Sequence, residues 1–214
     1  MSLLHPTPTT LATTTNTDHN QILTRLAAYK TALLLRAILI PDLVRPILEH
    51  AQLYNHQTSV SDQYQVISAD NTPAACLQSE QISCLARTKF PVRRVTFTIV
   101  AKEQGFGAWP GQGQWTWFSA GVLKRGGQED EEEEEGGVIG DERVVARNCS
   151  SADGGFGTLV VVWSADSEDG EEARWVRGLG VGDRVVVRGY AERSGWRSFV
   201  RFVRVEIETI VVVR

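Results

Sequence analysis

Apolar residues recur along this chain with two different periods, and the period changes near residue 91. Between residues 21 and 54 they return every three or four positions, which is typical of amphipathic helices. After residue 91 they alternate with polar residues, which is typical of strands that have one face in a core. The pattern therefore predicts a helical segment followed by a mainly β domain.

The helical segment is predicted to be a hairpin. Its first apolar stripe ends at Pro41, and a second stripe runs from Leu43 to Tyr54. Proline lacks a backbone N–H and ends a helix. We therefore expect two short helices over residues 21–56 that pack on their own domain.

The chain on either side of this hairpin is weakly patterned. Residues 1–20 are rich in threonine and aperiodic, so we expect a disordered tail. Residues 1–40 hold a single acidic residue, and a mitochondrial presequence is an open alternative for them. Residues 57–90 are interpreted as a connector, with one short strand near 64–67.

Six alternating runs follow residue 91 and are separated by glycine-rich turns. Strands of this length and spacing indicate an antiparallel sandwich, and no helical pattern alternates with them as a parallel α/β sheet requires. We therefore predict that residues 91–214 form an antiparallel β-sandwich of jelly-roll type. The predicted strands are 92–102, 115–122, 143–149, 157–165, 183–192 and 199–213.

An acidic insertion interrupts this series of strands. Residues 129–135 read EDEEEEE and carry seven negative charges, so the formal net charge of −4 becomes −4 + 7 = +3 for the rest of the chain. Adjacent like charges repel one another and cannot be buried. We expect residues 124–142 to form a disordered surface loop.

Tryptophan is concentrated in one stretch. Residues 102–118 read KEQGFGAWPGQGQWTWF and contain three of the six tryptophans. Trp115 and Trp117 are two positions apart in an alternating run, so their rings share one face of a strand. Large aromatic residues that share a face usually lie in the core, and we predict that this face is the core or its margin.

Other aromatic residues lie in turns. Phe106 and Trp109 sit among glycines outside any alternating run, and Trp196 with Arg197 follows Gly195 in a second turn. Loops cluster at the ends of a sandwich, and Trp and Arg are enriched at interface hot spots. We predict Phe106, Trp109, Trp196 and Arg197 as ligand-binding residues, with a role in plugging the ends of the core as the structural alternative.

No pattern in the sequence points to a catalytic residue, a metal or a cofactor, and we expect none. The glycines before Trp115 run into a strand instead of a helix, and no Gly-Lys-Ser/Thr follows, so a phosphate loop is not expected. All four histidines precede residue 57, and with Cys76 and Cys84 they match no zinc spacing. The carboxylates of residues 166–172 (DSEDGEE) fail the EF-hand register, although a calcium site between strands stays an alternative. We interpret them as a hairpin turn with solvated charges.

The composition limits the cellular compartments and the classes of partner that we expect. Three cysteines without close pairing favour a reducing compartment, and neither a secretory signal nor a membrane span is recognised. We therefore expect a cytoplasmic or nuclear protein that does not bind membranes. The arginines are interspersed with acidic residues, so nucleic-acid binding is not expected. We expect a monomer.

Two segments together resemble a family of uncharacterised fungal proteins: KEQGFGAWPGQGQWTWF and LGVGDRVVVRGYAERSGWRSFVRFVRVEIE. Members typically show Asp-Gln-Gly-Trp, Ser-Trp-Thr-Trp-Phe and Gly-Asp-Arg…Gly-Trp motifs, and the resemblance covers residues 91–213. At the first motif this chain reads Glu-Gln-Gly-Phe over 103–106 instead. Many members carry an F-box-like N-terminal piece, and residues 40–54 (IPDLVRPILEHAQLY) look similar to part of one. The resemblance implies a sandwich like the sugar- or protein-binding jelly rolls attached to F-boxes.

These observations lead to one hypothesis of function and two alternatives. We expect a non-catalytic module that binds a protein or a glycan through loops at one end of the sandwich. The first alternative is an F-box-like adaptor. The second is a glycoside hydrolase, which needs two carboxylates facing each other about 5 to 9.5 Å apart. The candidate carboxylates are Glu103, Asp153, Asp166 and Asp183.

Overall fold

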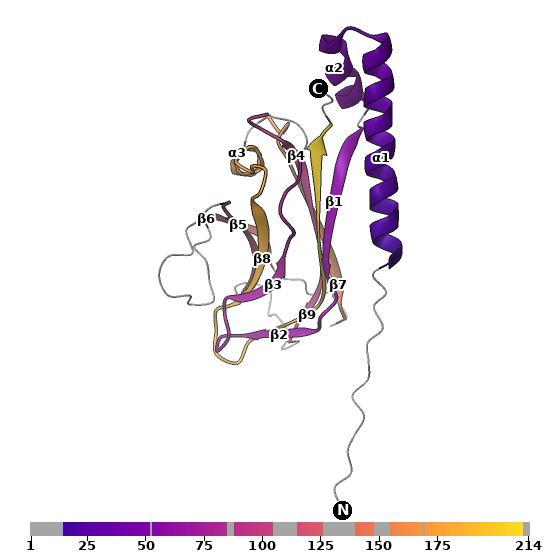
Figure 1. Ribbon diagram of the computed structural model, residues 1–214. Coiled ribbons are helices and arrows are strands. Elements are labelled where there is room, and N and C mark those ends of the chain that lie inside the picture. The colour runs from indigo at the N-terminus through magenta and orange to yellow at the C-terminus, as the bar shows by residue number, and fades with distance from the viewer. Residues whose placement is uncertain are drawn as a thin grey trace, which may run out of the picture.

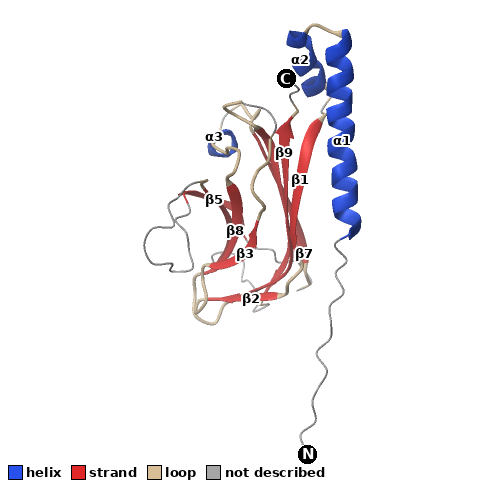
Figure 2. Ribbon diagram, viewed as in Figure 1, coloured by secondary structure: helices blue, strands red, loops and turns tan. Residues whose placement is uncertain are grey.

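Two antiparallel β-sheets face each other, and a pair of N-terminal helices lies beside the edge that carries β1 (Figure 1). This computed structural model describes residues 15–51, 53–84, 88–104, 115–125, 140–147, 155–168 and 170–211. The sheets are the two layers of a sandwich, and a short third helix lies at one end of it (Figure 2). The predicted fold class, a mainly β antiparallel sandwich preceded by a helical hairpin, is confirmed.

The described chain contains three helices and nine strands. The helices are α1 (Thr15–Ile38), α2 (Pro41–His50) and α3 (Glu171–Arg177). The strands are β1 (Tyr54–Ser61), β2 (Gln65–Ser68), β3 (Ala74–Gln78), β4 (Val92–Glu103), β5 (Thr116–Leu123), β6 (Gly140–Arg147), β7 (Gly157–Ser164), β8 (Arg184–Ala191) and β9 (Arg197–Ile210).

The first sheet, sheet A, is built around the two longest strands, β4 and β9, which are antiparallel neighbours. Its strand order is β1-β9-β4-β7, and β2 pairs with the first residues of β9. Alternation along β4 and β9 sends one set of side chains into the core, as the sequence predicts. The buried set comprises Val95, Phe97, Ile99, Val203, Val205 and Ile207.

The second sheet, sheet B, has the strand order β3-β8-β5-β6. On its inner face β8 carries Gly189, where a Cβ would stand only 2.0 Å from the Cδ1 atom of Ile67 on β2. A residue without a Cβ is therefore required for the two layers to approach this closely.

Three aromatic rings fill one end of the core. Trp163 of β7 makes edge contacts with Phe97 and Trp175, at ring-centroid distances of 4.9 and 5.0 Å. Trp175 comes from α3, is 1% exposed and donates its indole N–H to the carbonyl of Asp141 at 2.7 Å. The short helix α3 therefore closes the core at the end where β7 finishes.

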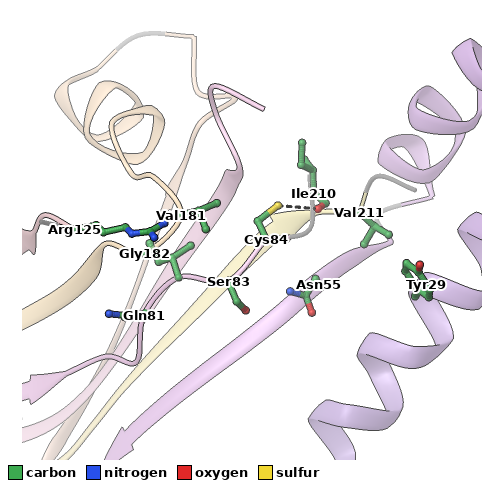
Figure 3. Close-up of a pocket in the computed structure, with 11 residues that line it drawn as sticks. Tyr29, Asn55, Gln81, Ser83, Cys84, Arg125, Val181, Gly182, Ile210 and Val211 are labelled. Carbon is green, nitrogen blue, oxygen red and sulfur yellow. Dashed lines mark hydrogen bonds between the residues drawn. The ribbon is translucent and has the colours of Figure 1, made fainter. Parts of the chain in front are cut away.

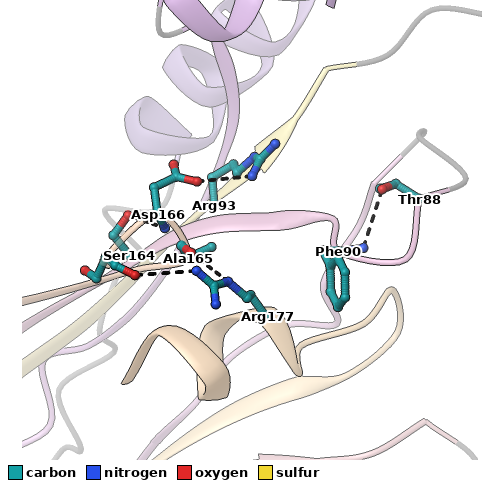
Figure 4. A network of polar contacts seen from close by, with 8 residues as sticks. Thr88, Phe90, Arg93, Ser164, Ala165, Asp166 and Arg177 are labelled. Carbon is teal, nitrogen blue, oxygen red and sulfur yellow. Dashed lines mark hydrogen bonds and ion pairs between the residues drawn. The ribbon is translucent and has the colours of Figure 1, made fainter. Parts of the chain in front are cut away.

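Residues 166–172 do not form the hairpin turn predicted from their charges. β7 and β8 lie in different sheets, and the turn after β7 leads into α3. Arg93 pairs with Asp166 at 3.3 Å, and Arg177 of α3 donates to the carbonyl of Ala165 at 2.8 Å (Figure 4). The hairpin interpretation was wrong. The chain crosses from sheet A to sheet B here through α3, and the charged residues at the beginning of this helix made the segment look like a solvated turn.

The segment 57–90, interpreted from the sequence as a connector, supplies strands to both sheets. β1 and β2 pair with β9, and β3 pairs with β8, so the interpretation was wrong for these residues. The predicted short strand near 64–67 corresponds to β2. Apolar alternation is weak here partly because β1 turns a glutamine inward: Gln57 is 3% exposed and hydrogen-bonds to the carbonyl of Gln81 and the N–H of Ser83.

The N-terminal helices form a hairpin with its own small cluster of buried residues. Ala32 of α1 packs with Val44 and Leu48 of α2, and Val211, directly after β9, packs against them. α1 begins at Thr15, so residues 15–20 are helical and not part of a disordered tail. α1 runs beside β1 (Figure 1). Among the described helices, none combines the length and the apolar character that crossing a bilayer requires.

Most of the predicted acidic loop lies outside the described residues. Of residues 124–142, the structure describes 124–125, which follow β5, and 140–142, which open β6. β5 and β6 are antiparallel neighbours, so the insertion connects two paired strands of sheet B.

Candidate functional site

Trp115 and Trp117 lie on the solvent side of sheet B, not on the face predicted to be the core or its margin. Thr116 and Phe118 between and beside them are each only 1% exposed, whereas both tryptophans are half-buried. The inner face of β5 is therefore the one that carries Phe118.

The rest of β5 explains this orientation. The face that carries Phe118 continues with Ala120 and Val122, which complete the core. The tryptophan face continues with Ser119 and Gly121, which offer a core almost no apolar surface. The prediction from the tryptophans alone was wrong because the whole strand, not its two largest residues, decides which face is buried.

Each indole has a neighbour against its ring. β5 lies between β6 and β8, so Trp117 is directly opposite Arg147 on one side and Tyr190 on the other. The rings of Trp117 and Tyr190 stack with centroids 5.0 Å apart and planes 3° apart, and the guanidinium carbon of Arg147 is 5.8 Å from the Trp117 centroid. The guanidinium carbon of Arg193 lies 3.5 Å from the centroid of Trp115.

These side chains form one surface, which we name the arginine–aromatic face. No ion pair joins its arginines to a carboxylate within the described residues. The surface therefore combines half-buried aromatic rings with positive charge. Its members are Trp115, Trp117, Arg147, Arg188, Tyr190 and Arg193.

The acidic residue that touches this face is already engaged. Glu142 accepts hydrogen bonds from the hydroxyls of Tyr190, at 2.5 Å, and of Ser119. Burial, and then the hydrogen bond and charge of Glu142, raise the pKa of Tyr190, while hydrogen bonds with Ser119 and Arg188 act in the opposite direction. Tyr190 is thus a neutral donor at physiological pH, and its bond holds the Glu142 carboxylate at the edge of the face.

Two of the four predicted ligand-binding residues are described. Trp196 is half-buried in the turn between β8 and β9, where Gly195 adopts a left-handed φ of 86°. Arg197 is exposed and is the first residue of β9. Phe106 and Trp109 lie outside the described residues.

The turn that holds Trp196 adjoins the arginine–aromatic face. The N–H of Glu192 donates to the carbonyl of Trp115 at 2.9 Å, and the N–H of Gln104 donates to the carbonyl of Arg197 at 2.9 Å. The two ends of the glycine-rich segment therefore meet the same turn, at the end of the sandwich where the sequence predicted recognition.

A pocket of about 740 Å³ lies at the opposite end, between α1 and the last residues of β9 (Figure 3). Its volume is within the range of small-ligand sites. Arg125 is the one charged residue of this lining, and the thiol of Cys84 donates to the carbonyl of Ile210 at 3.5 Å. The lining residues are Tyr29, Asn55, Gln81, Ile82, Ser83, Cys84, Arg125, Val181, Gly182, Ile210 and Val211.

Asp183 fixes the wall that carries Arg125. Its carboxylate is buried and accepts hydrogen bonds from Lys124 Nζ at 2.8 Å, from the N–H of Arg125 at 3.2 Å and from the N–H of Gly180 at 2.8 Å. The Gly-Asp-Arg motif at residues 182–184 therefore has a structural role in joining β5 to the turn before β8.

The described carboxylates that were candidates for hydrolysis do not share one site. Glu103 ends β4, whereas Asp166 pairs with Arg93 at the beginning of the same strand. The length of β4 separates them, roughly 35 Å at 3.3 Å per residue. Asp183 is held by Lys124, and Asp153 lies outside the described residues. Among the described side chains, no three His, Cys, Asp or Glu residues are grouped as a metal site requires.

Comparison with known proteins adds no identification. No protein-family model and no curated protein matches the sequence, so the resemblance to a fungal family stays a prediction. One solved structure, the infectious bursal disease virus VP2 subviral particle, aligns at a TM-score of 0.26 with 9% identity, covering 72% of this chain and 41% of that one. The chain thus spans less than half of that protein, and a similarity this low carries no argument.

Proposed function

We propose that this protein is a non-catalytic binding module that recognises an acidic segment of a protein partner through the arginine–aromatic face. The observation that carries the proposal is Trp117, a large aromatic residue placed on the solvent side of a sheet between Tyr190 and Arg147. Tryptophan, tyrosine and arginine are the residues that dominate protein–protein hot spots.

The arrangement of the rings favours a protein over a glycan. A sugar stacks on the open face of an aromatic ring, but Tyr190 and Arg147 flank Trp117, and Arg193 lies over Trp115. Both faces of Trp117 and one face of Trp115 are therefore occupied, and rings held in this way are rigid apolar anchors for partner side chains.

The charges favour an acidic partner. Arg147, Arg188 and Arg193 lack a carboxylate ion pair among the described residues, and guanidinium groups bind carboxylates and phosphates with two parallel hydrogen bonds. Binding at such a surface should weaken as salt screens the charges.

The test is a fluorescence-anisotropy titration with a fluorescein-labelled decaglutamate peptide. Because residues 129–135 carry seven acidic charges of their own, the titration is run on the whole chain and on a variant that lacks residues 126–137. We expect saturable binding that weakens about tenfold or more in the Arg147→Glu/Arg188→Glu double variant, since hot-spot losses exceed 1 kcal/mol.

The matched control is Arg201→Glu, which makes the same charge change at an exposed residue of the other sheet. It should leave the affinity nearly unchanged, and Trp117→Ala should reduce it. If the Arg201 and Arg147/Arg188 variants lose affinity equally, the peptide is held by general charge attraction and not by the arginine–aromatic face. Absence of peptide binding, together with binding of neutral glycans that Trp117→Ala abolishes, would replace the protein partner by a sugar.

A second candidate function, the F-box-like adaptor, is favoured by the surface of the helical hairpin. Leu34, Ile38, Ile40 and Leu43 are between 50% and 78% exposed, although α1 and α2 bury a second apolar stripe between them. The test is a pull-down with the purified adaptor protein that F-boxes bind. Capture that is lost in Leu34→Glu/Ile38→Glu but kept in Arg147→Glu/Arg188→Glu would support this role.

A further inference from the structure

The described strands of the two sheets include five edge strands, and four of them carry a feature that discourages further pairing. β2, which pairs with β9 beside β1, has only four residues. β1 is packed against α1. β3 has five residues and a register shift between Ala75 and Leu77. β6 carries four charged residues among its eight. Covering helices, short irregular strands and charges are the usual means by which edges avoid pairing with other chains.

The remaining edge strand, β7, is neither short, irregular nor charged, and its contact with α3, between Trp163 and Trp175, lies on the core side of the strand. Its sequence, GTLVVVWS, contains no charged residue and no proline, and its eight residues pair with β4 in continuous register. Val160 is 60% exposed and Val162 is 53% exposed on the outer face of this strand. An edge of this kind offers a row of free backbone hydrogen-bonding groups beside an apolar surface.

We infer that β7 is the pairing edge for a second copy of this chain, joined antiparallel across a two-fold axis. In the register centred on Val161, Val160 lies opposite Val162 of the second copy, and Val162 lies opposite its Val160. Directly opposite residues of an antiparallel pair share one face, so the four exposed valines meet on the outer side.

The same register makes the strand complementary to itself. Leu159 lies opposite Trp163 of the second copy on the inner side, and Thr158 lies opposite its Ser164. Because β7 has no charge, no like charges meet across the axis. A second copy therefore fits this edge without any change of sequence, and the two A sheets become one continuous sheet. We therefore predict a dimer at sufficient concentration, where the sequence alone led us to expect a monomer.

The test is sedimentation velocity of the full chain over a concentration series. The wild-type mass should rise from 23.7 kDa toward twice that value. Val160→Lys/Val162→Lys should stay at the monomer mass, because this register places lysines opposite lysines. Both valines are exposed, so near-ultraviolet circular dichroism should show an unchanged fold. The matched control is Val60→Lys, at an exposed valine of the opposite edge strand β1, which should dimerise like the wild type.

A mixing experiment tests the register itself. Val160→Glu/Val162→Glu should also be monomeric alone, but an equimolar mixture of the lysine and glutamate double variants should dimerise again. The inference is overturned if the wild type stays a monomer throughout the series, or if the lysine double variant dimerises as the wild type does. Failure of the mixture to form dimers would also overturn the proposed pairing.

Discussion

At the scale of single residues, adjacent side chains of β5 have opposite environments. Phe118 is buried against the other sheet, and Trp117 is held on the outside by Tyr190 and Arg147. Hydrophobicity would rank the tryptophan as the better core residue, but the strand face decides which of them the core receives. Because the core does not require a tryptophan at the outward position, its presence there is better explained by binding than by packing.

This contrast gives a stability prediction. Phe118→Ala should lower the free energy of unfolding by about 3–5 kcal/mol, because it removes a fully buried ring and leaves a cavity. Trp117→Ala should cost about 1–2 kcal/mol, because it removes one stacking partner and a half-buried surface. Urea denaturation of the two variants measures the difference. Equal losses would mean that Trp117 is a core residue after all.

Glu103 gives a prediction that depends on pH. Burial raises its pKa, and the hydrogen bond from Thr116 acts in the opposite direction. A raised pKa means that the folded state binds the proton more tightly than the unfolded state, so stability is lost as pH rises through that pKa. Glu103→Gln should therefore raise the urea midpoint at pH 7, and the gain should shrink as the pH falls toward about 4.

The control for this variant is Glu192→Gln, which neutralises an exposed carboxylate beside the same turn. Its urea midpoint should follow that of the wild type at both pH values. A Glu103→Gln variant that is less stable than the wild type at pH 7 would show that ionised Glu103 stabilises the fold.

At the scale of elements, the sequence predicts strands well where alternation is strong and poorly where it is not. The inner faces of β4 and β9 follow directly from their alternating valine, isoleucine and phenylalanine residues. β1 was missed because polar Gln57 faces inward with its hydrogen bonds satisfied, and α3 because its first turn reads as charge. Trp175 was the available signal, since a lone tryptophan among charged residues seldom stays exposed.

The residues of the candidate site were likewise predicted only in part. The sequence singled out Trp196 and Arg197, and the turn that holds them adjoins the arginine–aromatic face. It missed Tyr190 and Arg188, although alternation in residues 183–192 places both on the strand face opposite Val185 and Val187. Arg147 could not be predicted from the sequence, because the sequence does not show which strand pairs with β5.

The acidic insertion gives a prediction at this scale. Deletion of residues 126–137 should leave the thermal midpoint nearly unchanged, because adjacent like charges contribute no packing and surface insertions cost little in closure entropy. Differential scanning calorimetry measures it. A loss of more than a few degrees would mean that the acidic run makes stabilising contacts.

At the scale of the whole molecule, the sandwich separates its surfaces. The arginine–aromatic face lies on the outside of sheet B, the pocket lies at the end near the helices, and the exposed edge of β7 belongs to sheet A.

The orientation of β5 is the central claim, because the proposed binding face exists only if its tryptophans point outward. The chain is labelled with 5-fluorotryptophan, and ¹⁹F NMR is recorded with increasing amounts of a soluble gadolinium chelate. Single Trp→Phe substitutions assign the resonances. We predict that the Trp117 resonance broadens strongly while those of Trp163 and Trp175, 5% and 1% exposed, stay sharp. A Trp117 resonance as protected as these two would place it in the core and contradict the proposed face.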